Sequence, residues 1–409
     1  MKWTEGLDKL GIGMYLLLCC FAIANIYSVD EGLGTKQFIF FIISLIVGFF
    51  IFVVRGKFFE NMSGIFYIGG VLLLVGLFPF GTEILGQKNW YKFGGITLQP
   101  VEFAKIGTAL MLANYASGPD FNLKYKNSLF TSAIIVGIPA IVVLLIPDVG
   151  SLLVFFAFVI ALYREGLTGY LFVWIAIFAG VFLFSIAVNP WYVIAGIVFL
   201  AFIFIIKNYR AIHWNIVTIA SISGIILLLS GFSIVTPTVL EKLPKHQRER
   251  IEVLYKGERA FRDTSGYNLL YSKTAIGSGG LLGKGYREGS VTRGKFVPEQ
   301  ETDYIFCTVG EEWGFLGSTF LILLYVTFIA RIYYLAEQQK SVFNRVFGYS
   351  FASILLMHFG INIGMVMGLF PTVGIPLPYF SYGGSSLLAF SVMTAIFFKL
   401  NYVDKNSLV

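Results

Sequence analysis

Apolar runs long enough to cross a membrane recur along almost the whole of this 409-residue chain. A bilayer core about 30 Å thick needs about 20 apolar residues per helix, and backbone groups in lipid must pair within their own segment. Each run therefore predicts a transmembrane helix, and counting the runs predicts about twelve. The composition agrees, because 57% of the residues are hydrophobic and 13% are charged, about half the charged share of a soluble domain. We expect an all-α polytopic membrane protein that forms a single domain over residues 1–409.

The distribution of Lys and Arg predicts how the chain is threaded, because cytoplasmic loops collect these residues. Arg55 and Lys57 follow the second run, and Lys124 and Lys126 precede the fifth. Both termini are accordingly expected in the cytoplasm, and residues 79–99 are expected to form an external loop. The formal net charge of +7 follows from the same bias, so we do not expect nucleic-acid binding.

Three apolar runs lie within residues 166–235. If all three cross the membrane, the polar stretch that follows lies outside the cell. A single crossing would give the same sidedness, so a re-entrant or interfacial pair of segments stays open.

Residues 236–303 form the only long polar stretch of the chain, between a helix expected to end near Val235 and one expected to start near Val309. The threading makes this stretch a large external loop. Its many cations run against the bias toward the cytoplasm, which loops longer than about 60 residues escape. Cations kept outside in this way would attract a polyanionic head group.

Glu102 and Lys105 are three residues apart in the fourth apolar run, so they share one helix face near its outer end. Ionisable groups inside a membrane are costly unless they pair or face a cavity. The pair is therefore a functional hypothesis, and a buried ion pair that only fixes helix packing is the alternative.

Several other residues have both a functional and a structural interpretation. Asp148 is expected to cap the sixth helix through the N–H groups of Gly150 and Ser151, or to take part in chemistry. Trp90 is expected either to form a sugar-stacking or lipid-facing wall or to lie in the interfacial aromatic belt. The glycine-rich segments 277–285 and 383–386 either bring backbone N–H groups close to an anion or form flexible turns.

Asp263 is the only Asp of the polar stretch before Asp303, and Arg259, Arg262 and Lys273 flank it. A carboxylate in this setting either acts as a base on a sugar hydroxyl or is a solvated loop residue. The three Cys and three His residues show no metal-ligand or disulfide spacing.

Taken together, these motifs resemble the SEDS family (shape, elongation, division and sporulation), and its RodA branch more than its FtsW branch. The resemblance runs in order over most of the chain. It rests on QPVEFAK (99–105), PDVG (147–150), AIGSGGLLGKG (275–285), FVPEQETD (296–303), GEEWG (310–314) and GIPLPYFSYGGSS (374–386).

The resemblance implies a peptidoglycan glycosyltransferase that polymerises lipid II at the outer face of the bacterial cytoplasmic membrane. It also implies a class B penicillin-binding protein as partner and, from the RodA-like motifs, a role with the elongation machinery. The family's essential Asp precedes a Gly-Tyr pair, which matches Asp263 ahead of Gly266-Tyr267, although the link is shorter here. The family has ten spans, so the three runs within 166–235 predict an extra helical hairpin.

In the mechanism that the resemblance implies, Asp263 deprotonates the acceptor's 4-hydroxyl, which attacks the anomeric carbon and expels undecaprenyl pyrophosphate. Loop cations would offset the charge of the leaving group, a task that a divalent metal, Mg or Mn, could share. The substrate-binding or cavity residues expected beside Asp263 are Glu102, Lys105, Trp90, Asp148, Lys273, Lys284, Arg287, Ser381, Gly383, Gly384 and Ser385.

Two other function classes remain open from the sequence. A lipid II flippase or other polyprenyl-lipid transporter would also use a charged intramembrane pair and Gly-broken helices. A non-catalytic scaffold that recruits the penicillin-binding protein is the third class.

Overall fold

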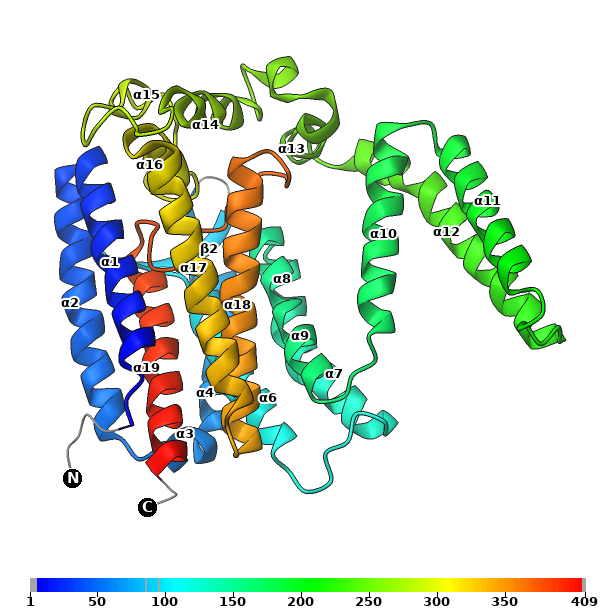
Figure 1. Ribbon diagram of the computed structural model, residues 1–409, viewed down its shortest axis with the longest axis horizontal. Coiled ribbons are helices and arrows are strands. Elements are labelled where there is room, and N and C mark those ends of the chain that lie inside the picture. The colour runs from blue at the N-terminus through cyan, green and yellow to red at the C-terminus, as the bar shows by residue number, and fades with distance from the viewer. Residues whose placement is uncertain (1–5, 85–86, 95, 407–409) are drawn as a thin grey trace. The chain divides into compact units, whose positions relative to one another are not determined.

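The structure, a computed structural model, describes residues 6–84, 87–94 and 96–406 (Figure 1). The chain divides into two compact units, residues 1–167 together with 268–409, and residues 168–267, where the sequence predicted one domain. We call them the first and the second unit and describe each by itself.

The first unit is a helical bundle in which helices distant in sequence pack together (Figure 1). Helix α4 packs on α6, α2 on α19, and α18 on α6, α9 and α17. The central members are α18 and α19, which have 67% and 72% of their apolar segments buried. Its helices are α1 (Lys9–Val29), α2 (Glu31–Val53), α3 (Gly56–Asn61), α4 (Ser63–Val75), α5 (Leu77–Phe80), α6 (Pro100–Ala116), α7 (Lys126–Leu145), α8 (Val149–Phe155), α9 (Ala157–Arg164), α14 (Tyr267–Ser278, all but its first residue), α15 (Ser290–Arg293), α16 (Phe306–Glu312), α17 (Gly314–Glu337), α18 (Val342–Val366) and α19 (Gly384–Asn406).

The prediction of a polytopic membrane protein is confirmed. In the described ranges, ten helices, with α4 and α5 counted as one, are long and apolar enough to cross a membrane. The expected number of about twelve would also require α6, which has 17 residues, and the helix pair α8 and α9, which is broken at Phe156. That number stays a prediction.

The expected external loop 79–99 contains a small antiparallel sheet in the order β1-β2-β3. Its strands are β1 (Thr82–Ile84), β2 (Gln87–Phe93) and β3 (Ile96–Leu98). Trp90 of β2 lies opposite Thr82, and Tyr91 lies opposite Leu98. The sheet leads directly into α6 and so fixes where that helix begins.

In the second unit the three apolar runs form helices of spanning length, α10 (Tyr170–Ala187), α11 (Pro190–Asn208) and α12 (Ile216–Lys242). They pack on one another, and a hydrogen bond of 2.8 Å between the hydroxyls of Ser185 and Ser233 joins α10 to α12. The unit continues with α13 (Lys245–Lys256) and a short 3-10 helix, η1 (Glu258–Phe261).

The predicted start of the polar stretch 236–303 is wrong. Helix α12 does not end near Val235 but continues through Pro237 to Lys242. A proline removes one backbone donor without stopping a helix outright, and the Thr236 hydroxyl donates to the carbonyl of Phe232 at 2.7 Å. The stretch holds α13, η1, α14 and α15, and the helix expected near Val309 begins at Phe306.

Candidate active site

Glu102 and Lys105 lie in the first two turns of α6, which starts at Pro100. Proline suits this position because its missing N–H would be unpaired in any residue there. The Lys105 Nζ atom is 2.8 Å from Glu102 Oε1, and the two side chains are 0% and 1% exposed. The sequence prediction that they share one helix face is confirmed. Glu102 Oε2 is also buried, and no group in the described part of the chain hydrogen-bonds to it.

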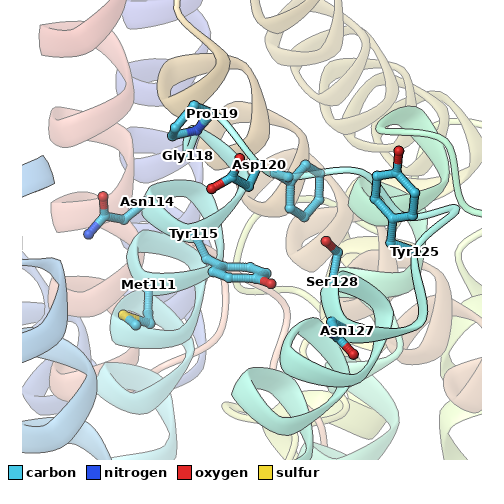
Figure 2. A pocket seen from close by; sticks show the side chains of 10 residues that line it. Met111, Asn114, Tyr115, Gly118, Pro119, Asp120, Tyr125, Asn127 and Ser128 are labelled. Atoms are coloured by element: carbon cyan, nitrogen blue, oxygen red, sulfur yellow. The ribbon is translucent and has the colours of Figure 1, made fainter.

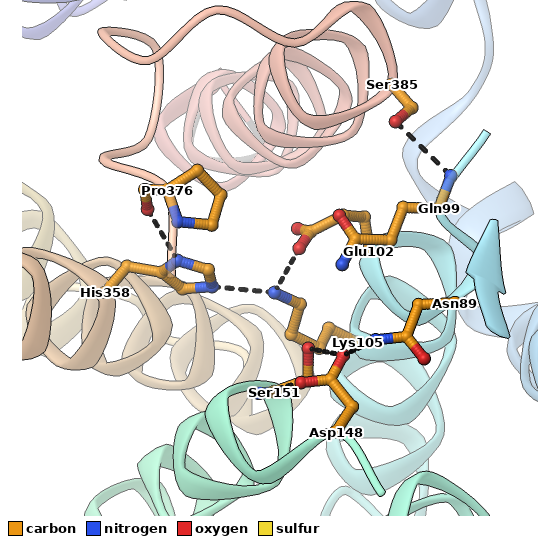
Figure 3. A network of polar contacts seen from close by, with 9 residues as sticks. All are labelled: Asn89, Gln99, Glu102, Lys105, Asp148, Ser151, His358, Pro376 and Ser385. Carbon is orange, nitrogen blue, oxygen red and sulfur yellow. Dashed lines mark hydrogen bonds and ion pairs between the residues drawn. The ribbon is translucent and has the colours of Figure 1, made fainter. Parts of the chain in front are cut away.

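His358 of α18 completes this pair (Figure 3). Its Nε2 atom is 2.7 Å from Lys105 Nζ, and its Nδ1 atom is 3.1 Å from the carbonyl oxygen of Pro376. The Phe390 ring closes the site, with its centroid 5.4 Å from Lys105 Nζ. The sequence analysis missed His358, although a histidine within an apolar run is itself a signal of a functional group.

Asp148 caps α8, as predicted, through Ser151. The Ser151 N–H donates to Asp148 Oδ1 at 2.9 Å, and the Ser151 hydroxyl donates to Oδ2 at 2.7 Å. Asn89 of β2 also donates to Asp148 Oδ2, at 3.1 Å. One carboxylate therefore joins the external sheet to the start of α8, beside Lys105 (Figure 3).

Ser381 and Asn362 fasten the loop between α18 and α19. The Ser381 hydroxyl donates to the carbonyl of Thr302 at 2.6 Å and accepts from the N–H of Leu377 at 2.8 Å. The Asn362 amide donates to the carbonyls of Asp303 and Ile375 at 2.8 and 2.7 Å. Both side chains thus hold the FVPEQETD motif against the GIPLPYFSYGGSS motif.

The predicted anion site at 383–386 has two of its groups occupied within the protein. The Gly383 N–H donates to Gln37 Oε1 at 3.2 Å, and the Ser385 hydroxyl accepts from the N–H of Gln99 at 3.3 Å. Ser385 thereby orients the residue that precedes Pro100 (Figure 3). Gly384 begins α19 against the Phe40 ring, where a side chain would clash.

The glycine-rich segment 277–285 does not cradle an anion with its last three amides. The N–H groups of Gly283, Lys284 and Gly285 donate to the carbonyls of Gly279, Glu311 and Glu312 at 2.9, 2.9 and 3.1 Å. That interpretation is wrong for these amides because each already has a backbone acceptor: Gly279 of the same segment for Gly283, and the GEEWG backbone for Lys284 and Gly285. We call the joined segments 277–294 and 310–314 the clasp.

Glu311 is the centre of the clasp. Its buried carboxylate receives the Lys284 ammonium at 2.6 Å and the N–H groups of Val291 and Thr292 at 3.0 and 2.8 Å. Burial alone would raise the pKa of Glu311, but the ammonium and the two amides lower it below its ordinary value. Lys284 is therefore already neutralised by an internal carboxylate.

Arg287 and Lys273 are also held by neighbours in the first unit. Arg287 Nη2 lies 2.8 Å from Oε1 of Glu31, the first residue of α2, and its guanidinium stacks on the Tyr27 ring at 5.0 Å. Lys273 of α14 packs against Gly368, where a Cβ atom would lie 2.9 Å from Lys273 Nζ. Trp90 is half-buried in β2, and its role in stacking on a sugar stays a prediction.

Asp263 belongs to the second unit, in the turn that joins η1 to α14. Its side chain is 84% exposed, and its Oδ1 atom is 3.5 Å from Arg262 Nε. Gly266 is required in this turn because a Cβ atom would crowd the carbonyls of Glu258 and Phe261. An accessible carboxylate thus precedes the tight turn that the Gly-Tyr pair makes.

The first unit also contains two pockets. A pocket of about 550 Å³ between α6 and α7 is lined mainly by polar and aromatic side chains, among them Asn114, Tyr115, Asp120 and Tyr125 (Figure 2). An apolar groove of about 480 Å³ is formed by α2, α3, α4, α6 and α19. Phe103 and Ile106 line it, so the groove flanks the Glu102–Lys105 turn of α6.

The part of the chain that the structure describes contains no preformed metal site. Within residues 6–84, 87–94 and 96–406, no group of three or more His, Cys, Asp or Glu side chains could hold a metal ion. A divalent ion such as Mg²⁺ would have to be held largely by phosphate oxygens of a substrate, as it commonly is.

Fold and site together define a polytopic membrane protein whose bundle encloses a network of charged and polar side chains. The profile of the FTSW_RODA_SPOVE family, described as a cell cycle protein, matches residues 7–210 and 168–406. The chain belongs to this family. The two matches overlap over residues 168–210, which contain α10 and α11, in the region of the predicted extra hairpin.

Curated relatives agree with this assignment. Peptidoglycan glycosyltransferase MrdB of Escherichia coli is 30% identical over 331 residues, 81% of this chain and 75% of that protein. Peptidoglycan glycosyltransferase RodA of Treponema pallidum is 26% identical over 84% of this chain and 83% of that protein. The probable peptidoglycan glycosyltransferase FtsW of Enterococcus hirae is 27% identical over 94% and 89%.

Solved structures share the fold. The Thermus thermophilus rod shape determining protein RodA superposes with a TM-score of 0.64 at 21% identity, covering 99% of both chains. A chain of a peptidoglycan synthase complex superposes with a TM-score of 0.72 at 22% identity, covering 98% of this chain and 99% of that one.

Proposed function

We propose that this chain is a peptidoglycan glycosyltransferase that polymerises lipid II into glycan strands at the outer face of the cytoplasmic membrane. The observation that carries the proposal is the match to E. coli MrdB, a peptidoglycan glycosyltransferase, over 81% of the chain. The match is supported by a buried charged pair on the QPVEFAK motif and an accessible Asp263 before the Gly-Tyr turn.

Asp263 is the proposed general base. It takes the proton of the acceptor's 4-hydroxyl while the hydroxyl oxygen bonds to the anomeric carbon of the growing strand. The bond between that carbon and the pyrophosphate oxygen breaks, and undecaprenyl pyrophosphate leaves with the electron pair. The exposure of the Asp263 carboxylate supports this role, since a base must reach the proton it removes.

Loop cations are proposed to offset the charge of the pyrophosphate. Lys284 and Arg287 each have one internal carboxylate partner, Glu311 and Glu31, so they would act on the leaving group only through a second contact or an exchange of partner. Lys273 is the third proposed cation. A divalent metal held by the pyrophosphate oxygens would share this task.

The apolar groove beside Glu102 and Lys105 is the proposed place for the undecaprenyl chain. Its lining is almost wholly hydrocarbon, including Phe50, Phe66 and Phe103, and it opens along helices of membrane-spanning length. An apolar groove next to charged groups suits a lipid that carries a polar head.

A class B penicillin-binding protein is the proposed partner, and cell elongation the proposed process. The RodA-like motifs and the fold shared with a chain of a peptidoglycan synthase complex support this view. The termini are proposed to lie in the cytoplasm, with residues of the 236–303 stretch, including Asp263, outside.

The test is polymerisation of labelled lipid II by the purified protein with its class B partner in detergent, with Asp263→Asn as the variant. We expect glycan polymer from the wild type and a loss of at least about 100-fold in the variant, because a positioned base contributes roughly that much. Asp120→Asn, which changes another exposed carboxylate, is the matched control and should retain activity.

Other outcomes would favour other functions. Full activity of Asp263→Asn would remove Asp263 from the mechanism. A wild type that forms no polymer but translocates lipid II in liposomes would favour a transporter, and one that does neither while binding its partner would favour a scaffold. Activity that EDTA abolishes and Mg²⁺ restores would support the metal, whereas activity unaffected by EDTA would contradict it.

A further inference from the structure

His358 is a buried titratable residue for which the proposed mechanism has no task. It is 2% exposed in the middle of α18, whereas the other two histidines, His213 and His246, are exposed. Both of its ring nitrogens have partners at hydrogen-bonding distance. A ring fixed at both ends is the kind of group that orients a neighbour.

The partners determine where the ring proton lies. The Pro376 carbonyl only accepts, so Nδ1 must carry a hydrogen and donate it at 3.1 Å. The other ring nitrogen, Nε2, shares one proton with Lys105 Nζ. The lysine amine is by far the stronger base, and its ammonium faces the Glu102 carboxylate at 2.8 Å, so this proton stays on Nζ. Nε2 is then a bare acceptor, and the imidazole is neutral in the Nδ1–H form.

The position of Lys105 decides which oxygen of Glu102 is occupied. The ammonium bridges Glu102 Oε1 and His358 Nε2, and Asp148 lies nearby (Figure 3). The centroid of the Phe390 ring is 5.4 Å from Lys105 Nζ. Glu102 Oε2 keeps no hydrogen-bond partner among the described residues. A buried carboxylate oxygen without a hydrogen-bond donor costs free energy, so a donor that reached Glu102 Oε2 would be bound favourably.

We propose that His358 is a positioning residue that holds the Lys105 ammonium on Glu102 Oε1 and so keeps Glu102 Oε2 available to a hydroxyl or amide donor of the substrate. The substrate part of this inference rests on the proposed glycosyltransferase function. Without the His358 acceptor, the freed N–H of Lys105 would turn to Glu102 Oε2 and occupy that oxygen.

The hydrogen-bond assignment is tested without any activity measurement. With only three histidines in the chain, ¹⁵N-histidine labelling of the full-length protein in nanodiscs gives three imidazole signal sets. We expect one set in the Nδ1–H neutral form that does not change between about pH 6 and pH 8, the range in which ordinary histidines titrate, and that disappears in His358→Gln. An Nε2–H or doubly protonated ring at this position would overturn the proposal.

The consequence for catalysis is tested with two variants. His358→Phe keeps a ring beside Phe390 but offers Lys105 no acceptor, whereas His358→Gln restores an acceptor oxygen. Because a hydrogen bond to a charged group is lost, we expect kcat/KM for lipid II polymerisation to fall at least about tenfold in His358→Phe and to recover largely in His358→Gln.

Matched melting temperatures and gel-filtration profiles keep this comparison independent of folding. Wild-type activity in His358→Phe, or equal losses in two equally stable variants, would overturn the positioning role. An inactive wild type would instead overturn the proposed function, and the labelling experiment would still decide the His358 bond. If His358→Phe does not fold, His358→Gln with near wild-type kinetics supports the proposal, and a stable but inactive His358→Gln opposes it.

Discussion

Glu311 and Lys284, 27 residues apart, form an ion pair of 2.6 Å that ties the glycine-rich segment to the GEEWG motif. The carboxylate is 0% exposed, and it also receives two backbone N–H groups from the first turn of α15. A single side chain thus holds a loop that contains two of the predicted cations. Its removal should loosen the loop before it affects the membrane helices.

We expect Glu311→Gln to destabilise the clasp by about 2 kcal/mol, because hydrogen bonds to a charged group are replaced and the new amide donor faces backbone donors. Hydrogen exchange measured by mass spectrometry should speed up in peptides covering 284–294. Glu288→Gln, an exposed carboxylate in the same loop, is the control and should leave exchange unchanged. Equal protection in both variants would show that Glu311 does not hold the loop.

The clasp should also loosen in acid. The pKa of Glu311 is lower in the folded protein than its ordinary value of 4.5, so the unfolded loop binds the proton more readily. The stabilisation is therefore fully present above that ordinary value and is lost as the pH falls through the lower folded pKa. Exchange in 284–294 should stay constant from neutral pH to about pH 5 and then rise, once the intrinsic rate is corrected. Glu311→Gln should not show this step, and a step that persists in it would assign the effect to another group.

Gly314 offers a test of the backbone geometry. Its φ of +62° is left-handed, and a Cβ atom would overlap the amide of Gly283. We expect Gly314→Ala to lower the melting temperature by several degrees, or to abolish stable expression, because strain and overlap add. Gly137→Ala in α7, where no atom lies within 4 Å of the added carbon, should be neutral. Similar melting temperatures for the two variants would contradict the close approach.

The apolar groove can be tested by filling it. Gly69 lines the groove, and no neighbour lies within 4 Å of a Cβ atom added there. Gly69→Leu should raise KM for lipid II several-fold with little change in kcat, because it removes binding space without touching the polar groups. Gly64→Leu, on the same helix but outside the groove, serves as the control. A KM unchanged by Gly69→Leu would place the lipid chain elsewhere.

The sequence predicted the membrane class and several local contacts because these depend on short-range rules. Hydrophobic runs set the helices, and three-residue spacing set the Glu102–Lys105 pair. Asp148 before Val149-Gly150-Ser151 predicted a cap that the structure contains. Each of these needs only the neighbouring residues of the chain.

The partners of the glycine-rich segment and of Lys105 could not be predicted in the same way. The amides of Lys284 and Gly285 meet carbonyls 27 residues further on, and His358 meets Lys105 across 253 positions. Periodicity carries no information on such pairs, since they depend on which helices pack together. The end of α12 was missed as well, because the helix loses one donor at Pro237 and still continues to Lys242.

The clasp also bears on how this family can be engineered. The backbone hydrogen bonds from Lys284 and Gly285 to residues 311–312, with Gly283 and Gly314 in contact, make two separate stretches of sequence behave as one unit. A chimera that takes the glycine-rich loop from a relative but keeps its own GEEWG segment would combine two segments whose contacts do not match. Loop exchange should therefore succeed when both stretches are transplanted together.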